Sequence, residues 1–577
     1  MHADLDRRDA CAVLRAHALA TPAAQALVFV ADPEAEPDGR SWTYGELDER
    51  ARAIAVALRA RLPRGSRVLL LFPQGGEAVH AFAGCLYAGM VAVFAPAGGR
   101  YRHERARVRV IARDARVGVV LTDSASRASV AELLADQGMT DLDVLAVDDI
   151  ADGADDWAEP DVDRSAPALL QYTSGSTSDP KGVLVTHGNL LANAQDMVDV
   201  LGLPDRARLG GWSPLYHDMG LMGQVTPPLF LGGACVLMAP MAFLKRPHLW
   251  LRLIDRHDLY MSAAPNFAYE LCVRRIADEH IAGLDLSRWH LACNGSEPVH
   301  IPTMRAFAER FAAFGLQPHA MTPCYGLAEA TVLVSGTRDR AYAVCSVDRD
   351  ALRRNEFTPA SGPDAQPLAS CGVTGGLTVR IADPVTLRPL GAGEIGEVLL
   401  RGQSIAQGYW ENPAATAEVF DVSTSDGEGG FLRTGDLGVL HEGELYITGR
   451  LKEMLIVHGR NLYPQDIEQE LRAQHAPLAG LTGAVFAVAD EGVAEPAVTV
   501  VHEIRGRFTD AEHDALAAQM RQTVAREFGV AVADVVFVRP GTVLRTTSGK
   551  VQRVAMRQAY LTGGLAPVRA GATALAG

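Results

Sequence analysis

The sequence predicts an α/β protein built in two parts. A large N-terminal domain of layered α/β sheets with a β-rich subdomain is followed by a small, mobile α+β domain. Three observations lead to this prediction. The chain has 577 residues, more than one hydrophobic core usually holds. Short apolar runs alternate with helical patterns up to roughly residue 335. From residue 375 the pattern changes to short alternating segments separated by glycine-rich turns.

Composition and charge restrict the partners and the location. The net charge of −15 disfavours nucleic acid and anionic membranes as partners, since both attract basic surfaces. No apolar run approaches the roughly 18 residues of a membrane span, so no integral membrane segment is expected, and the N-terminus does not resemble a signal peptide. Eight scattered cysteines without a C-x-x-C pair fit reduced thiols, most of them in the core, and a cytoplasmic location.

The first 150 residues alternate between helix and strand patterns. Thr43 and Glu46 form a possible capping box at the start of a helix whose apolar residues share one face. The predicted elements are a helix over 43–62, a strand over 67–72, a helix over 76–90 and a strand over 117–123. Helices between short buried strands predict a largely parallel sheet that is covered on both faces.

The remaining chain divides into segments of different character. An acidic connector (151–167) leads into further α/β structure, a polar, irregular stretch follows (335–370), and antiparallel β-structure is expected over 375–450. We place the domain boundary at 449–452. The predicted units are therefore an N-terminal domain over 1–449, a C-terminal lid over 450–562 and a flexible tail over 563–577.

One loop carries the first chemical signal. "QYTSGSTSDPKG" (171–182) begins as a strand and breaks into hydroxyl residues, glycines and Lys181. Glycines let backbone N–H groups turn toward an anion, hydroxyls add donors, and the lysine adds a positive charge, so the loop suits a polyphosphate. Lys181 is one of only four lysines among 54 basic residues. The spacing is not that of the Walker P-loop, and a flexible surface loop is the alternative interpretation.

This loop resembles the phosphate loop of the adenylate-forming (acyl-activating, AMP-binding) enzyme superfamily. Further motifs of that superfamily follow in order over roughly residues 20–560: "PLYHDMGLMG" (214–223), "CNGSEPV" (293–299), "CYGLAEAT" (324–331), "RTGDLG" (433–438), "GRLKEMLIVHGRNLYPQDIE" (449–468) and "TTSGKVQR" (546–553). Three of the four lysines fall on the phosphate loop, the hinge and the C-terminal catalytic loop. The fourth, Lys245, is interpreted as a surface residue.

The resemblance implies that a carboxylic acid reacts with ATP to give an acyl-adenylate and pyrophosphate, with ATP and Mg²⁺ as cofactors. It assigns the phosphates to Thr173, Ser174, Gly175, Ser176, Thr177 and Lys181, and Mg²⁺ to Thr173 and Glu329. It assigns the adenine pocket to Gly295, Ser296, Glu297, Tyr325 and Gly326, and the ribose to Asp436 and Arg450.

The remaining assignments concern catalysis and motion. Lys550 is expected to reach the α-phosphate and the substrate carboxylate, His217 to lie on the substrate side, and Lys452 to be the hinge between domains. Taken singly, several of these residues have simpler interpretations. Asp436 suits a turn, Glu329 a helix start and His217 a packed core histidine. The ordered set of motifs favours the catalytic interpretation.

Within the superfamily, the motifs look closest to the fatty acyl-AMP ligases. The additional residues at 335–370, relative to CoA ligases, lie where that group carries its characteristic insertion. The segment "LASCG" (368–372) also resembles a segment of that group. This implies a fatty acid substrate and transfer to the phosphopantetheine thiol of an acyl carrier protein, for polyketide, nonribosomal peptide or lipid biosynthesis. Ser296 and His458 depart from the residues expected there, alanine and arginine.

Three other functions were weighed. An acyl- or aryl-CoA ligase would share the motifs but use CoA as acceptor. A non-catalytic nucleotide-binding relative is disfavoured because Lys181, Glu329, Asp436 and Lys550 are all present. An amino-acid-activating domain is disfavoured because His217 stands where an aspartate is expected, although the neighbouring Asp218 leaves the alignment open.

Overall fold

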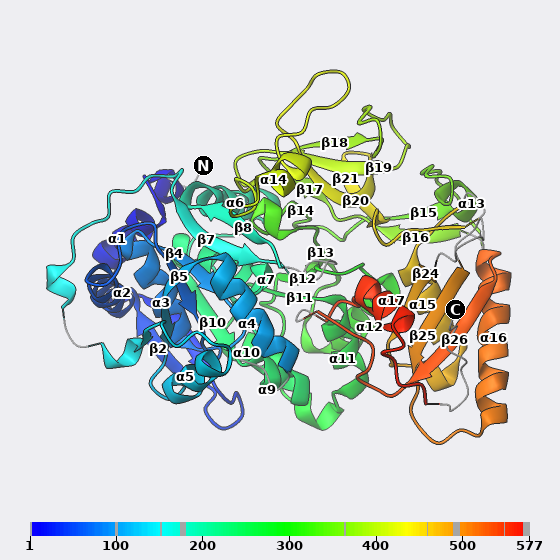
Figure 1. Ribbon diagram of the computed structural model, residues 1–577, viewed down its shortest axis with the longest axis horizontal. Coiled ribbons are helices and arrows are strands. Elements are labelled where there is room, and N and C mark those ends of the chain that lie inside the picture. The colour runs from blue at the N-terminus through cyan, green and yellow to red at the C-terminus, as the bar shows by residue number, and fades with distance from the viewer. Residues whose placement is uncertain are drawn as a thin grey trace.

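The computed structural model describes residues 3–97, 102–150, 153–173, 180–362, 365–457, 460–488, 497–546 and 549–568. Two large sheets fill the N-terminal part (Figure 1). The six-stranded sheet runs β6 (Val144–Ala146), β5 (Val117–Thr122), β3 (Arg67–Leu70), β4 (Val91–Phe94), β7 (Pro167–Tyr172) and β8 (Gly182–Thr186). The seven-stranded sheet runs β13 (Met321–Pro323), β12 (Leu291–Asn294), β11 (Met261–Ala264), β9 (Arg208–Gly211), β10 (Ala234–Met238), β1 (Gln25–Val30) and β2 (Arg40–Thr43).

Helices separate and cover these sheets. They are α1 (Ala10–Ala20), α2 (Tyr44–Arg59), α3 (Gly76–Ala88), α4 (Arg102–Asp114), α5 (Arg127–Asp136), α6 (His187–Leu201), α7 (Asp218–Gln224), α8 (Thr226–Phe230), α9 (Pro240–Lys245), α10 (His248–Arg256), α11 (Asn266–Arg275) and α12 (Ile301–Phe311). Among the described residues, no helix is both long and apolar enough to cross a bilayer.

The pairing confirms the predicted α/β class. Within the two large sheets the strands pair in parallel except at β7–β8 and β1–β2. The capping box at the start of α2 is also confirmed, with Thr43 accepting from the Glu46 N–H and Glu46 accepting from the Thr43 N–H. The parallel strands are buried on both faces because helices lie on each side, which explains their continuous apolar runs.

The β-rich region confirms the expected antiparallel structure. β18 (Thr378–Ala382), β19 (Gly396–Arg401), β20 (Leu432–His441) and β21 (Glu444–Arg450) form a four-stranded antiparallel sheet, with α14 (Pro413–Val419) between β19 and β20. The stretch over 335–370 is more regular than its polar sequence indicates. It contains β14 (Ser335–Gly336), the pair β15 (Val344–Asp348) and β16 (Ala365–Ala369), and α13 (Arg349–Leu352), while β14 pairs with β17 (Val373–Thr374).

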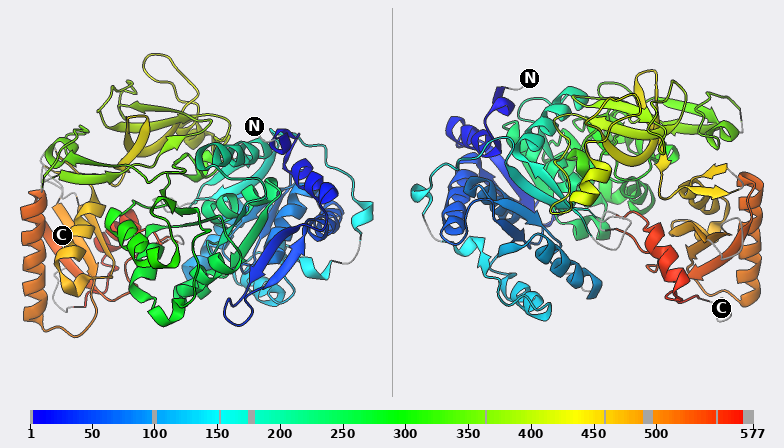
Figure 2. Two further views of the ribbon diagram at one scale, coloured as in Figure 1. Left: turned by 180° about the vertical axis from the view of Figure 1, so that it is seen from behind. Right: turned by 45° about the horizontal axis from the view of Figure 1, so that its top comes forward.

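The C-terminal part has its own core. A short pair, β22 (Leu455–Val457) with β23 (Arg460–Leu462), precedes a sheet of β24 (Gly483–Val488), β25 (Ala497–Glu503) and β26 (Val532–Val538). α15 (Pro464–Gln474), α16 (Asp510–Phe528) and α17 (Arg553–Leu561) accompany this sheet. The apolar residues of α15 and α16 form one cluster with it, and those of α17 form a second. Both views in Figure 2 place this part at the end of the molecule opposite α1 and α2.

The acidic connector and the start of the C-terminal tail both make contacts with the rest of the chain. The acidic connector packs on the N-terminal helices, where Trp157 lies against Tyr87 and Arg52 donates to the Ala154 carbonyl. The start of the predicted flexible tail is also held, because Pro567 forms a β-bridge with Val538 and the Val568 N–H donates to the Phe537 carbonyl. Residues 569–577 lie outside the described part of the chain.

Candidate active site

Three predicted nucleotide-binding residues meet at one end of the four-stranded sheet. Asp436 on β20 lies directly opposite Arg450 on β21 and is only 3% exposed. The Arg450 Nε donates to Asp436 Oδ1 at 2.7 Å, and the Tyr325 hydroxyl donates to Asp436 Oδ2 at 2.7 Å. Residues far apart in sequence therefore converge on a single buried carboxylate. Burial and the adjacent Asp436 charge raise the pKa of Tyr325 well above its ordinary value, so its hydroxyl stays protonated.

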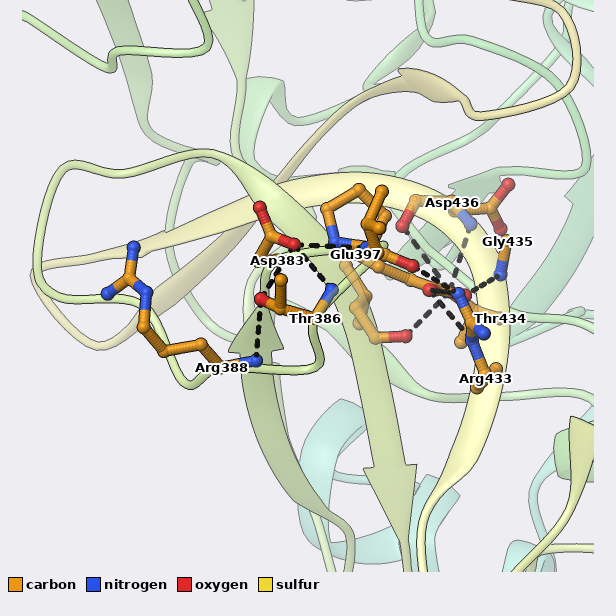
Figure 3. A network of polar contacts seen from close by, with 11 residues as sticks. Asp383, Thr386, Arg388, Glu397, Arg433, Thr434, Gly435 and Asp436 are labelled. Atoms are coloured by element: carbon orange, nitrogen blue, oxygen red, sulfur yellow. Dashed lines mark hydrogen bonds and ion pairs between the residues drawn. The ribbon is translucent and has the colours of Figure 1, made fainter. Parts of the chain in front are cut away.

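The segment that carries Asp436 leaves the regular strand ladder. Gly435 has φ of +69°, a conformation that favours glycine, and its N–H donates to the Glu397 carboxylate (Figure 3). The Thr434 hydroxyl accepts from the Asp436 N–H at 3.0 Å. These contacts fix the backbone on both sides of the carboxylate.

The C-terminal lysine loop packs against the N-terminal part of the molecule. Gly549 has φ of +90° and packs on Phe267 of α11, since a Cβ at this position would lie 2.7 Å from the Phe267 ring. Lys550 follows directly, and its N–H donates to the Thr546 hydroxyl at 3.1 Å. The loop is thus seated on the N-terminal part through a close contact that only glycine allows.

Lys550 faces charges of both signs. Burial and the positive charge of Arg450 lower its pKa, while Asp218, Asp436 and Glu297 oppose that shift. Its ammonium group is therefore within electrostatic range of three carboxylates from three different segments. A cation so placed can neutralise an anion that enters between the two parts of the protein.

The predicted adenine segment lies beside this loop. The Glu297 Oε1 accepts from the Phe267 N–H at 2.6 Å, and burial raises the pKa of Glu297. Ser296 holds an uncommon φ of +69°. At Gly326 a Cβ would lie 1.7 Å from the Val332 carbonyl oxygen, and at Gly295 it would lie 3.0 Å from the Cys324 carbonyl oxygen. Backbone packing alone therefore demands glycine at position 326.

The phosphate side connects two predicted residues through a third that the sequence analysis missed. The Lys181 Nζ lies 4.8 Å from the centre of the Tyr409 ring, and the Tyr409 hydroxyl donates to Glu329 Oε1 at 2.8 Å. The Thr173 N–H donates to the Lys181 carbonyl at 3.2 Å and closes the base of the loop. Ser174, Gly175, Ser176 and Thr177 lie outside the described residues.

His217 and Asp218 form a close pair at the start of α7. The His217 Nδ1 lies 2.6 Å from Asp218 Oδ1, and both side chains are mostly buried. Burial alone would raise the pKa of Asp218, but His217 and Lys550 together lower it. The Asp218 carboxylate is therefore favoured in its charged form beside the lysine loop.

The other two lysines are exposed. Lys452 is exposed in the turn after β21, and Lys245 is exposed at the end of α9, as expected of a surface residue. Tyr409 and Glu397 were not singled out from sequence. A glutamate inside the otherwise apolar "EVLLR" strand was the available signal for Glu397, since an unpaired buried carboxylate is costly.

The fold and these contacts define a class of protein. It is an α/β nucleotide-binding enzyme in which a buried carboxylate, flanked by a tyrosine and an arginine, faces a lysine loop from a smaller C-terminal part. Comparison with known proteins agrees. The AMP-binding enzyme family matches residues 14–410, and the family described as Disco-interacting protein 2-like, AMP domain, matches residues 452–569. The chain therefore belongs to the AMP-binding, adenylate-forming enzyme family.

Individual relatives cover nearly the whole chain. The medium-chain-fatty-acid–[acyl-carrier-protein] ligase JamA of Moorena producens is 40% identical over 92% of this chain and 91% of its own. The long-chain-fatty-acid–AMP ligase FadD26 of Mycobacterium bovis is 38% identical over 93% and 94%. A fatty acyl-adenylate ligase from L. pneumophila, solved with acyl adenylate and pyrophosphate, is 35% identical, covers 97% of both chains and superimposes with a TM-score of 0.75.

Proposed function

We propose that this protein is a fatty acid:AMP ligase, which converts a fatty acid and ATP into acyl-adenylate and pyrophosphate. The acyl group then passes to the phosphopantetheine thiol of an acyl carrier protein. Two observations carry the proposal: the lysine loop packs on Phe267 through Gly549, and Asp436 is held by Arg450 and Tyr325 on the four-stranded sheet. The names of JamA and FadD26 support the fatty acid substrate, and that of JamA supports the carrier protein.

The reaction joins two anions, so charge neutralisation and alignment are its main requirements. In our proposal the Asp436 carboxylate accepts hydrogen bonds from the ribose hydroxyls, with Arg450 beside it. Tyr325 and residues 295–297 border the adenine. Lys550 stabilises the negative charge that develops at the α-phosphate as a carboxylate oxygen of the fatty acid attacks phosphorus and pyrophosphate leaves.

The residues on the phosphate side suit Mg²⁺ bound together with ATP. Glu329 offers a carboxylate that Tyr409 already orients, and Thr173 lies at the base of the phosphate loop. Mg²⁺ prefers oxygen ligands and commonly uses one or two protein carboxylates together with substrate phosphates. When bound, it would neutralise phosphate charge. Lys181 would add a positive charge to the same region.

The choice of acceptor is proposed to depend on the 335–370 insertion. Its helix α13 and strand β16 contact the C-terminal part. Arg353 donates to the Glu527 carbonyl at 2.9 Å, and the Gln366 amide donates to Asp466 Oδ2 at 3.1 Å. These contacts would restrain rotation of a lid domain (450–562) about Lys452, and so disfavour free CoA. We keep the boundary at 449–452 and a cytoplasmic location as parts of this proposal; all eight cysteines are free thiols.

A hydroxamate-trapping assay across fatty, aryl and amino acids tests the activity. We expect signal with medium- or long-chain fatty acids and little with the other two classes; signal confined to amino or aryl acids would contradict the proposal. A second assay offers acyl-adenylate either CoA or a phosphopantetheinylated carrier protein. We expect transfer to the carrier protein. Replacing residues 335–370 with a short linker should raise CoA use, and no rise would remove the role of the insertion.

A further inference from the structure

A buried carboxylate without an assigned role lies behind Asp436. Glu397 is the second residue of strand β19 and is only 1% exposed. It accepts hydrogen bonds from Arg433 Nε at 2.9 Å and Nη2 at 2.5 Å, and from the Gly435 N–H at 3.1 Å. A charged side chain is almost never this buried unless it is paired. Its partners lie one and three residues before Asp436.

Glu397 holds an irregularity in the sheet. On β19 and β20, Glu397 pairs with Leu437 and Leu399 pairs with Arg433, so residues 434–436 lie opposite Val398 alone. Such a bulge leaves backbone groups without ladder partners and redirects side chains. The Glu397 carboxylate accepts a hydrogen bond from the Gly435 N–H, and the Thr434 hydroxyl donates to the Val398 carbonyl at 2.8 Å. The bulge is therefore held by side chains rather than by the strand ladder.

A surface turn supports the same arrangement from outside. The Arg433 Nη2 also donates to the Pro384 carbonyl at 2.8 Å. The Asp383 carboxylate closes this turn by accepting from the N–H groups of Val385 and Thr386 at 3.0 and 2.7 Å. Figure 3 shows the turn and the bulge on either side of Glu397. The Arg433 Nη2 thus bonds both the Glu397 carboxylate and the Pro384 carbonyl, which links the turn to the bulge.

We propose that Glu397 is a positioning residue for recognition of the ATP ribose. It does not touch the nucleotide. By pairing with Arg433 and the Gly435 N–H, it maintains the bulge that turns the Asp436 carboxylate toward Tyr325, Arg450 and the sugar. The inference rests on the proposed function, in which Asp436 binds the ribose hydroxyls.

The test uses nucleotides that differ only in those hydroxyls. Pyrophosphate exchange is measured with ATP and with 2′,3′-dideoxy-ATP, for wild type and Glu397→Gln. The glutamine keeps an acceptor for the Gly435 N–H but loses the charge-assisted pair with Arg433. We expect the wild-type preference for ATP in kcat/KM to fall about tenfold, as expected when a charged hydrogen bond is lost. The KM for the fatty acid should be unchanged.

Two further variants keep the test decisive. Glu394→Gln makes the same chemical change at an exposed glutamate close by and should keep the wild-type preference. If Glu397→Gln does not fold, Arg433→Lys takes its place, since a single lysine ammonium cannot reproduce the two bonds from Nε and Nη2 to Glu397 Oε2 and also reach the Pro384 carbonyl.

The outcomes separate this inference from the proposed function. An unchanged ratio of kcat/KM for the two nucleotides would overturn the role of Glu397. This includes an equal loss of activity with both, since a general folding defect affects both substrates alike. Loss of preference in Glu397→Gln but not in Glu394→Gln supports it. A wild type that exchanges no pyrophosphate with any fatty acid would instead refute the proposed function itself.

Discussion

The two sides of the candidate site are built differently. On the ribose side, Asp436 is fixed by side-chain contacts to Arg450 and Tyr325, and its backbone is fixed by the bulge on β20. On the other side, Lys550 comes from a loop seated on α11 by the Gly549–Phe267 contact. In the proposed mechanism, a preorganised sheet recognises the nucleotide, while a separate part of the chain delivers the catalytic charge.

The largest effect on the rate of adenylate formation should come from removing the Lys550 ammonium group. For Lys550→Ala, we expect adenylate formation at saturating ATP to fall about 100- to 1,000-fold, the usual loss when one transition-state contact is removed. The KM for ATP should change little. Stopped-flow measurement of pyrophosphate release checks this, with Lys245→Ala, which removes an exposed lysine, as the matched control. Equal turnover of Lys550→Ala and wild type would contradict the account.

The ribose side should respond in the opposite way. Asp436→Asn keeps the shape but leaves Arg450 and Tyr325 without their anionic partner, so we expect the KM for ATP to rise about 10- to 100-fold. The maximal rate should fall much less. Steady-state kinetics with ATP and fatty acid varied in turn would show this, and a pure rate defect with normal ATP affinity would break the comparison.

A smaller effect is expected at Tyr409. Tyr409→Phe keeps the ring under Lys181 but removes the hydroxyl that orients Glu329. Loss of one such hydrogen bond is worth about 1 kcal/mol, so we expect roughly fivefold weaker binding of Mn²⁺ in the presence of ATP. Electron paramagnetic resonance of Mn²⁺ checks this directly. Tyr409→Leu should also weaken ATP binding; identical behaviour of the two variants would argue against separate roles for ring and hydroxyl.

The contact between the insertion and the C-terminal part should show the smallest effect, on stability. Burial raises the pKa of Asp466 to about 6, although the Gln366 hydrogen bond opposes the shift. The folded state therefore binds this proton more tightly than the unfolded state, whose carboxyl has a pKa of about 3.9. The contribution of Asp466 to the free energy of unfolding is therefore fully present below pH ~4 and is lost as the pH rises through about 6.

Asp466→Asn removes this pH dependence. At pH 8 the variant avoids burying a carboxylate, so its Tm should be about 1–2 °C above that of wild type. The difference should shrink below pH ~4, where both side chains are neutral. Thermal unfolding followed across this range checks the prediction. A variant that is less stable than wild type at pH 8 would contradict it.

Sequence reasoning predicted the fold class because periodicity and capping are local signals. The parallel sheets, the capped helix α2 and the antiparallel region over 375–450 follow directly from runs of residues. The 335–370 stretch was harder, because β15 and β16 are short and separated by α13. Their apolar residues Val347, Cys345 and Leu368 become a hydrophobic face only when they pack on the cluster shared with β20 and β21.

Sequence motifs singled out Asp436 and Lys550, and the catalytic and ribose-binding roles given to them stay predictions. Glu397 and Tyr409 act through other residues. Glu397 acquires its partners only when β20 bulges past Val398, and Tyr409 only when its loop returns beside β8. No spacing along the chain encodes such contacts. Asp218 was noticed only as the neighbour of His217, whereas in the structure Lys550 and His217 both lower its pKa.

A crystal structure of the protein with a non-hydrolysable acyl-adenylate analogue would examine both sides of the site at once. We predict that the ribose hydroxyls lie within hydrogen-bond distance of the Asp436 carboxylate, and that the Lys550 ammonium contacts the group replacing the α-phosphate. A nucleotide bound elsewhere, or one that contacts neither Asp436 nor Lys550, would contradict the proposal that the sheet binds the ribose and the loop stabilises the α-phosphate charge.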